Sequence, residues 1–552
     1  MTDTSEPALD SRSAEEGAGG TTGGYTEPMS ADGTTGAHGR AGLADPDVAL
    51  TVHNPRVFPR RLPESSVRQL RRRAQQIAWV SAKNFAPLAL KAARKKPIPE
   101  NAYAKPLRLT FEELGATFMK FGQLIGSAPG VFGEEVANEF RSCLDTGAAV
   151  PFEIVRQTVE DELGMRLEDA FAAFEKEPLG RASIAVVHKA ITHGGREVAV
   201  KVLRPRIEAR VAVDLDLFQP LLDFVAKQTG EQAAGSLLQM FDGFREQIGE
   251  ELDLRNEARA MAHYRELLAQ VDLPLVTVPE PLFELSSGRV LTMEFIDGVP
   301  VDDLTSIEGF GYDPRPVVQQ VVQGFLLTTI RWGNFHGDVH AGNLLLRPDG
   351  RIGVIDWGIV GRMDAGTHFF FRRMIEAALG DATAWSDIAA HISRTYGPVI
   401  QEGLGLDEEQ FVVFVRQLME PVLTQPFGQV SLATMMNMPQ EQAMKARGLS
   451  AQDRSLGGIY RRFKEQRRLQ VVLDAHGGRE SDFDRGTFLL TKQLMYFERY
   501  GKMYLSDVSL FSDRAFFEAA LAMPTSIGHE GGESAARAKV DSEPRFGISP
   551  GR

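Results

Sequence analysis

The sequence contains one cysteine, Cys143, so neither an intramolecular disulfide nor a cysteine metal cluster can form. It also lacks the run of about eighteen apolar residues that a membrane-spanning helix needs. The first residues are acidic and rich in Gly and Thr, unlike a signal peptide, which is basic and then apolar. The eleven histidines are scattered and predict no structural zinc site. Together these absences predict a cytoplasmic protein.

Positive charge is scarce in the chain as a whole but concentrated near its N-terminus. The formal net charge is −13, which argues against a nucleic-acid partner. Residues 56–96 nevertheless carry about +11, with Glu64 as their only acidic residue, so the remainder carries roughly −24. Apolar residues recur there at helical spacing, and Pro87 should kink or divide the helix. Trp79 and Phe85 suit a helix on an anionic membrane surface; the alternative is a packed helix with a solvated basic face.

Composition and periodicity divide the chain into six segments. Both ends contain few large apolar side chains and are expected to be disordered. A strand-rich part followed by a helical part, with the chemistry at their junction, predicts an α+β fold with two lobes around a cleft. The expected segments are a disordered tail (1–55), a basic helical region (56–105), a second helical region (106–165), a strand-rich lobe (166–296), a helical lobe (297–515) and a second disordered tail (516–552).

Several elements are predicted within these segments. One apolar stripe in the second helical region leaves Lys120 and Gln123 together beside it, three residues apart. Two β-prone runs separated by Thr192-His193-Gly194-Gly195 predict a hairpin. The stripe consists of Leu114, Phe118, Phe121 and Ile125; the strands are expected over 183–190, 197–203, 275–278, 289–295 and parts of 343–355, and a helix over 237–268.

The segment from His336 to Asn343 carries the clearest chemical signal. Asp338 precedes Asn343 by five residues, and Asp356 begins a D-x-G sequence thirteen residues further on. Phosphoryl transfer from ATP needs a carboxylate to orient the acceptor hydroxyl and oxygen ligands for Mg²⁺. We therefore expect Asp338 to be the catalytic base and Asn343 and Asp356 to be metal ligands. Pro348-Asp349-Gly350 predicts the turn of a hairpin that positions both ligands.

A lysine and a glutamate should complete the phosphate site. Val198-Ala199-Val200-Lys201 has the form of the strand whose lysine bridges the α- and β-phosphates. We assign Glu257 as the partner of Lys201, with Glu251 as the weaker alternative, because one helix could present carboxylates to two partners. Glu294 and Phe295 are also assigned to nucleotide binding.

The glycine-rich loop of ordinary kinases is missing. The corresponding stretch, 178–188, keeps only Gly180, so backbone amides would approach the phosphates less freely. An altered nucleotide pose is the physical expectation.

These motifs together resemble the UbiB/AarF family of atypical kinases. Lys120-Phe121-Gly122-Gln123 fits its K-x-G-Q motif, and Ala182, Ser183 and Ile184 fall in its alanine-rich nucleotide loop. Glu251 and Asp253 fit its E-x-D motif. The resemblance implies a protein-kinase-like fold with a family-specific N-terminal helical extension that covers the cleft, bringing Lys120 and Gln123 near the E-x-D pair. Its loop departs from the family pattern at Gly180 and Arg181.

The resemblance further implies ATP and Mg²⁺ as cofactors and a role in isoprenoid-quinone or membrane-lipid metabolism, with ATPase activity favoured over protein phosphorylation. Quinone-biosynthesis proteins and, through the basic helices, the inner face of the membrane are the implied partners. Two alternatives remain. One is a small-molecule phosphotransferase of the aminoglycoside- or choline-kinase type, and the other is a nucleotide-binding scaffold without turnover.

Overall fold

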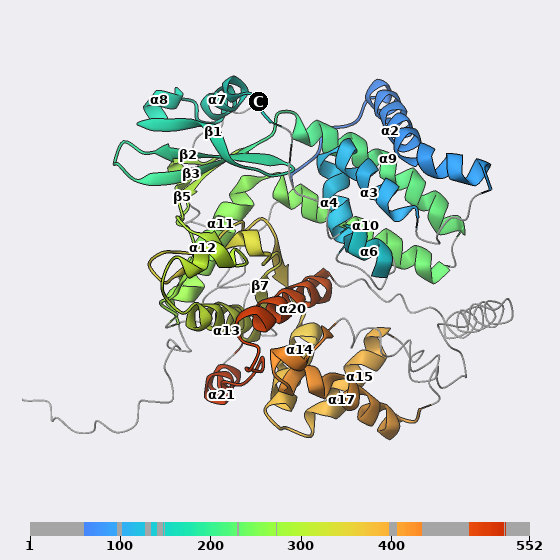
Figure 1. The fold of residues 1–552 in the computed structure, drawn as a ribbon, viewed down its shortest axis with the longest axis vertical. Helices are drawn as coiled ribbons and strands as arrows, with labels where there is room; N and C mark the ends of the chain where they lie inside the picture. Colours follow the sequence, from blue (N-terminus) through green and yellow to red (C-terminus); the bar gives the residue numbers. More distant parts are fainter. Residues whose placement is uncertain are drawn as a thin grey trace, which may run out of the picture. The chain divides into compact units, whose positions relative to one another are not determined.

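A computed structural model describes residues 60–95, 102–126, 134–140, 147, 149–228, 231–271, 273–396, 406–432, 485–523 and 525. The predicted N-terminal tail, most of the C-terminal tail and Cys143 lie outside the described residues. The described part forms two lobes, one built on an antiparallel sheet and the other mostly helical (Figure 1). The α+β, two-lobed prediction is confirmed. None of the described helices has the length and apolar character needed to span a bilayer.

The first lobe is built on a four-stranded antiparallel sheet in the order β1-β2-β3-β5. The predicted hairpin is confirmed: the Gly195 N–H donates to the Thr192 carbonyl at 2.9 Å, and Gly195 has the positive φ (+78°) that glycine tolerates. Helix α7 packs on the sheet through its buried Val155 and Val159. The strand-rich lobe therefore begins before residue 166. Its strands are β1 (Ala173–Arg181), β2 (Ala185–Ile191), β3 (Glu197–Leu203) and β5 (Val290–Glu294), and its small helices are α7 (Phe152–Leu163) and α8 (Leu167–Ala170).

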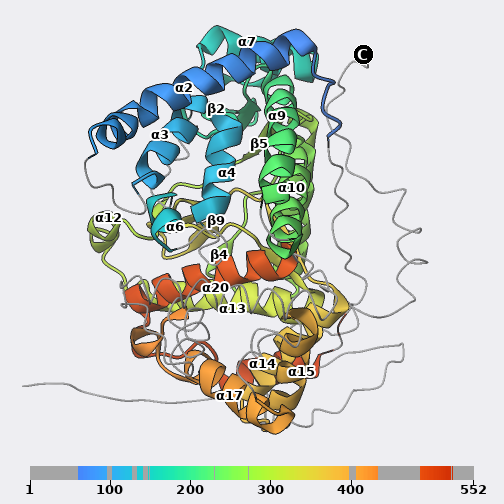
Figure 2. The same cartoon turned by 90° about the vertical axis from the view of Figure 1, so that its right-hand side faces the viewer.

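Beside this sheet lies a layer of helices (Figures 1 and 2). All four members of the predicted apolar stripe are at most 5% exposed, but the helix is broken at Gly115, so Leu114 lies on a different helix from the other three. Aromatic residues from four of these helices meet in one cluster, formed by Phe111, Phe118, Phe121, Phe218, Phe241 and Phe244. The helices are α2 (Val67–Ala93), α3 (Ala104–Leu114), α4 (Ala116–Gly126), α6 (Glu134–Phe140), α9 (Ile207–Gln228) and α10 (Glu231–Glu251).

The second lobe contains two small sheets and most of the remaining helices. One sheet has the order β4-β9-β8-β6, and the other pairs β7 with β10. Gly350, with φ +79°, lies in the predicted turn between β8 and β9, which confirms that hairpin. The strands are β4 (Val276–Thr277), β6 (Val299–Pro300), β7 (Asn334–His336), β8 (Leu344–Leu346), β9 (Ile352–Val354) and β10 (Val360–Arg362). The helices are α12 (Leu304–Glu308), α13 (Arg315–Trp332), α14 (Ala365–Ala378), α15 (Ala384–Tyr396), α17 (Glu408–Thr424), α20 (Arg485–Tyr504) and α21 (Arg514–Ala522). Helix α11 (Leu254–Ala269) precedes β5 and contacts β5 and α10.

Four predictions of local structure need correction. The helix expected over 237–268 is broken into α10 and α11, because Asp253 adopts an extended conformation and caps the N-terminus of α11. The basic helix is not divided at Pro87 but runs through it. The stretch 178–188, expected to form a nucleotide loop, is largely strand, because β1 ends at Arg181 and β2 begins at Ala185. The tail predicted from residue 516 begins too early, since α21 is ordered and buries Phe517 against Phe511.

Candidate nucleotide site

Lys201 lies in the centre of the first lobe's sheet and points toward two carboxylates from other segments. It occupies β3, where it pairs with Val187 and Leu291 of the neighbouring strands, and its side chain is 8% exposed. Its Nζ lies 2.9 Å from Glu257 Oε2 on α11 and 3.2 Å from Asp356 Oδ1. The structure therefore places Glu257, not Glu251, beside Lys201.

The charges in this group are strongly coupled. Burial disfavours the Lys201 ammonium, but the Asp356 and Glu257 carboxylates outweigh it and raise the lysine pKa. Burial raises the pKa of Glu257 to about 7, against the opposing effect of Lys201. Burial acts on Asp356 in the same direction, yet the Lys201 ammonium keeps its pKa below the usual range. Asp356 also has φ +57°, a backbone conformation that side-chain-bearing residues adopt rarely and mostly at functional sites.

The loop between β7 and β8, which carries Asp338 and Asn343, is fastened to the loop that carries Asp356. The fully buried His336 accepts from the Asp338 backbone N–H at Nδ1 (3.1 Å), so its proton lies on Nε2, which faces the Ile355 carbonyl at 3.3 Å. Asn343 Nδ2 donates to the Asp338 carbonyl at 2.9 Å. These contacts bring Asp338, Asn343 and Asp356 to one place, as the motif spacing predicts.

The K-x-G-Q segment meets the E-x-D segment. Lys120 on α4 lies 2.8 Å from Glu251 at the end of α10, and both side chains are nearly buried. Gln247 Nε2 also donates to Glu251 at 3.0 Å. Glu251 therefore has its own cationic partner and is not needed by Lys201. Gln123 lies on α4, one turn after Lys120.

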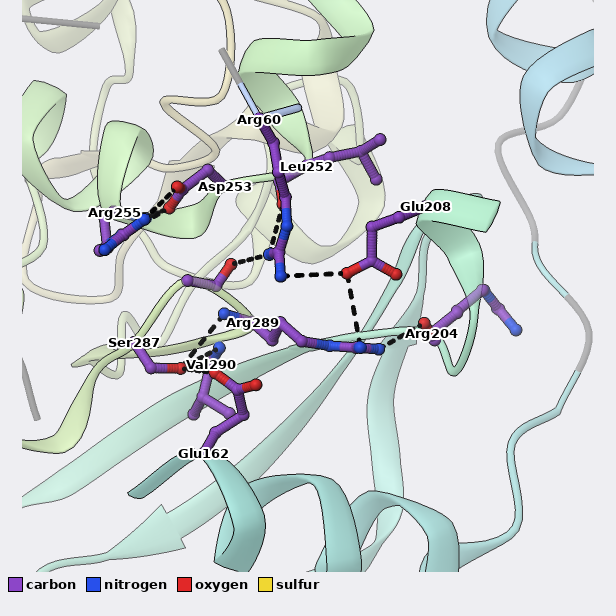
Figure 3. Close-up of polar contacts among 11 residues, drawn as sticks. Arg60, Glu162, Arg204, Glu208, Leu252, Asp253, Arg255, Ser287, Arg289 and Val290 are labelled. Carbon is purple, nitrogen blue, oxygen red and sulfur yellow. Dashed lines mark hydrogen bonds and ion pairs between the residues drawn. The ribbon is translucent and has the colours of Figure 1, made fainter. Parts of the chain in front are cut away.

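The break between α10 and α11 is held by a polar network (Figure 3). Asp253 accepts from the Arg255 backbone N–H at 3.2 Å and from the Arg255 guanidinium. Arg60, far upstream, donates to the carbonyls of Leu252 (3.2 Å) and Gly288 (3.4 Å) and pairs with Glu208 at 3.5 Å. The segment that precedes α2 thus braces the E-x-D turn.

One pocket gathers most of the predicted site residues. Ser183 and Ile184 are buried there, and the Ala182 carbonyl accepts from the Arg204 guanidinium at 2.9 Å. The pocket is lined by Lys120, Ala182, Ser183, Ile184, Lys201, Glu250, Glu251, Asp253, Glu257, Asp356 and Gly358.

Two of the predicted nucleotide-binding residues are not among those lining this pocket. Glu294 lies 3.8 Å from Arg196 and 3.9 Å from Arg265. The Lys189 ammonium lies over the face of the Phe295 ring, 4.4 Å from the ring centroid. Both lie at the end of β5, where the chain passes from the first lobe to the second.

Sequence reasoning missed Lys492. Its Nζ lies 2.6 Å from Asp338 Oδ1, and this ammonium, against the effect of burial, lowers the pKa of Asp338 to about 2. Lys492 lies on α20, 154 residues after Asp338. No local motif or spacing connects the two positions.

The donor set fits Mg²⁺ bound together with a polyphosphate. Mg²⁺ prefers oxygen ligands and commonly uses one or two carboxylates plus substrate phosphates and water. Asp356 offers a carboxylate in the cleft. The Asn343 amide nitrogen is engaged by the Asp338 carbonyl, which leaves its side-chain oxygen for a cation.

Comparison with known proteins agrees with this geometry. Residues 143–385 match the model of the ABC1 atypical kinase-like domain. An uncharacterized protein of Mycobacterium tuberculosis is 33% identical over 414 residues, which cover 74% of this chain and 76% of the relative. An uncharacterized chloroplastic aarF domain-containing protein kinase of Arabidopsis thaliana is 30% identical over 411 residues, covering 74% and 73%. A probable protein kinase UbiB of Aeromonas salmonicida is 30% identical over 343 residues, covering 61% of each chain. The chain belongs to the UbiB/AarF family of atypical, protein-kinase-like proteins.

Proposed function

We propose that the protein binds Mg-ATP and transfers its γ-phosphoryl group to an acceptor or to water. The observation that carries this proposal is the position of the Lys201 ammonium, within 3.2 Å of both Glu257 and Asp356. A lysine held in this way can contact the α- and β-phosphates, as it does in protein kinases. Bound Mg²⁺ would be held by Asn343 and Asp356 and would neutralise developing phosphate charge.

The remaining chemistry falls to the catalytic loop. The Asp338 carboxylate is ionised at neutral pH and can accept the proton of the acceptor hydroxyl or of water. Lys120 and Glu251, paired at 2.8 Å, close the cleft from the side of the helical extension. A covered cleft of this kind supports turnover on a small acceptor or water over phosphorylation of a protein segment.

Nucleotide binding should be lost when the phosphate or metal contact is removed. A ligand at about 100 times its Kd stabilises a protein by about 2.7 kcal/mol. We expect Lys201→Ala and Asp356→Asn each to abolish the increase in melting temperature that Mg-ATP causes. Asp338→Asn should keep that increase and lose turnover. Unchanged increases in both binding variants would contradict the site, and full turnover in Asp338→Asn would contradict its role as base.

We also propose that the protein works at the inner face of a membrane, in isoprenoid-quinone or membrane-lipid metabolism, alongside quinone-biosynthesis proteins. Two features support this: the family resemblance and the exposed face of α2, where Trp79 and Leu90 lie among basic residues. ATP turnover should rise when anionic vesicles containing a prenylated quinone precursor are added. An unchanged rate would argue against this setting while leaving Mg-ATP binding intact.

A further inference from the structure

A lysine from outside the matched kinase-like domain contacts Asp338, the residue assigned as the catalytic base. Lys492 Nζ lies 2.6 Å from Asp338 Oδ1, and the two side chains are only 17% and 19% exposed. The domain match ends at residue 385, whereas Lys492 lies on α20. A cation from this far along the chain is therefore in direct contact with the residue assigned as the base.

Helix α20 is fixed against the catalytic loop, so this contact is not a chance meeting of surface side chains. The Tyr500 hydroxyl donates to the carbonyl of Val339, the residue after Asp338, at 2.7 Å. The ring of Phe497, which is fully buried, stacks with that of Phe325 on α13. Leu489 packs closely on Gly337: a Cβ atom added to Gly337 would lie 3.3 Å from the Leu489 side chain. Contacts at both ends of the segment 489–500 thus hold α20 against the loop or its support.

The other two lysines of the cleft have different partners. Lys120 pairs with Glu251, and Lys201 pairs with Glu257 and Asp356. Among the described residues, Lys492 is the lysine in direct contact with the Asp338 carboxylate.

We propose that Lys492 is a positioning residue of the phosphoryl-transfer site. Its ammonium fixes the Asp338 carboxylate toward the acceptor and provides a fixed positive charge next to the transferred γ-phosphoryl group. In the reaction the acceptor oxygen bonds to the γ-phosphorus, the bond to the β–γ bridging oxygen breaks, and ADP leaves. Asp338 takes the acceptor proton, while Lys492 keeps its own. This inference rests on the proposed function.

Variants of Lys492 should separate turnover from nucleotide binding. Lys492→Met should lower kcat about 100-fold, the loss expected when a catalytic group is misplaced by about 1 Å, and leave the KM for ATP unchanged. Lys492→Arg keeps the charge and should retain more activity than Lys492→Met. The matched control is Lys502→Met on the same helix, whose side chain is 41% exposed and pairs with Glu498; its kcat should equal that of the wild type. A Lys492→Met enzyme as fast as the wild type, or faster, would overturn the proposal.

A labelling experiment on the unmodified chain tests the same point without relying on turnover or on a folded variant. An ATP analogue with an acyl group on its γ-phosphate transfers that group to lysines beside the phosphates. Mass spectrometry should find Lys492 acylated, along with Lys201, and excess Mg-ATP should suppress both. Labelling of Lys201 without Lys492 would overturn this inference alone. Labelling of neither would reject the nucleotide site, and this inference with it.

Discussion

Individual side chains in the cleft depend on partners that are distant in sequence. His336 is an example: it takes an N–H from Asp338 and faces the Ile355 carbonyl, so it ties two functional loops together. In the neutral ring, Nδ1 accepts the Asp338 N–H and Nε2 carries the proton that faces the Ile355 carbonyl. A second proton on Nδ1 would face the Asp338 N–H donor, so the fold accepts only the neutral ring. Burial accordingly lowers the pKa of His336 to about 4.

This histidine should make stability depend on pH. Its pKa is lower in the folded state than the ordinary value of 6.5, so between pH 6.5 and about 4 the unfolded chain binds more protons. The contribution of His336 to the free energy of unfolding should therefore be highest above pH 6.5 and fall by up to about 3 kcal/mol as the pH drops to 4, while the raised pKa of Glu257 acts in the opposite direction between about pH 7 and pH 4.5. Denaturant titrations at several pH values measure this slope.

His336→Asn is the informative comparison, because it removes the titrating ring. The stability lost on going from pH 6.5 to pH 4 should be smaller in this variant than in the wild type by up to about 3 kcal/mol, because Glu257, His188 and His368 still titrate in both proteins. Equal slopes in the two proteins would show that His336 is not the group responsible.

Among the secondary-structure elements, α2 is anchored by one buried ion pair. Arg73 contacts both Asp214 oxygens on α9, at 2.6 and 3.1 Å, and its Nη2 also donates to the Leu114 carbonyl at 2.8 Å. Its side chain is 7% exposed and that of Asp214 is 0% exposed. One member of the basic cluster is thus a structural residue that joins α2, α3 and α9.

Arg73→Met should destabilise the protein by about 3–5 kcal/mol, because it leaves the Asp214 carboxylate buried without its partner. The matched control is Arg72→Met, at the adjacent exposed position, which should change stability by at most about 0.5 kcal/mol. Chemical denaturation gives both values. A loss below 1 kcal/mol in Arg73→Met would mean that α2 is held by apolar packing instead.

On the scale of the whole molecule, segments from both ends of the described chain converge on the kinase-like domain. Arg60 braces the E-x-D turn, α4 closes the cleft with Lys120, and α20 contributes Lys492. Helix α2 packs inward through Arg73 and the buried Val80, yet its outer face exposes Trp79 (63%) and Leu90 (52%). The two interpretations of the basic helix are therefore compatible: its inner face packs on the protein, and its outer face is exposed and can contact a membrane.

The outer face of α2 should bind anionic membranes. Replacing Trp79 and Leu90 together by Ser should reduce sedimentation with phosphatidylglycerol vesicles several-fold, because apolar burial and charge attraction act together there. High salt should weaken binding of the wild type as well. Leu109→Ser removes an exposed leucine of α3 and serves as the control. Unchanged binding in the double variant would favour helix packing alone.

Much of the site could be predicted because its motifs are local. The five-residue spacing from Asp338 to Asn343 and the D-x-G at Asp356 specify a loop and a hairpin, and short-range geometry then places the side chains. The choice of Glu257 over Glu251 was also correct. The premise that one helix carries both residues was wrong, because Glu251 ends α10 and Glu257 lies on α11, which begins after Asp253.

The sequence by itself determined the residue types that can hold a nucleotide and a metal, and the β-then-helical order that puts them on two lobes. Only the tertiary structure decided which charges meet. Ion pairs such as Lys492 with Asp338, Lys120 with Glu251 and Arg73 with Asp214 join residues more than 130 positions apart. Long-range pairing depends on how helices pack, and neither periodicity nor motif spacing carries that information.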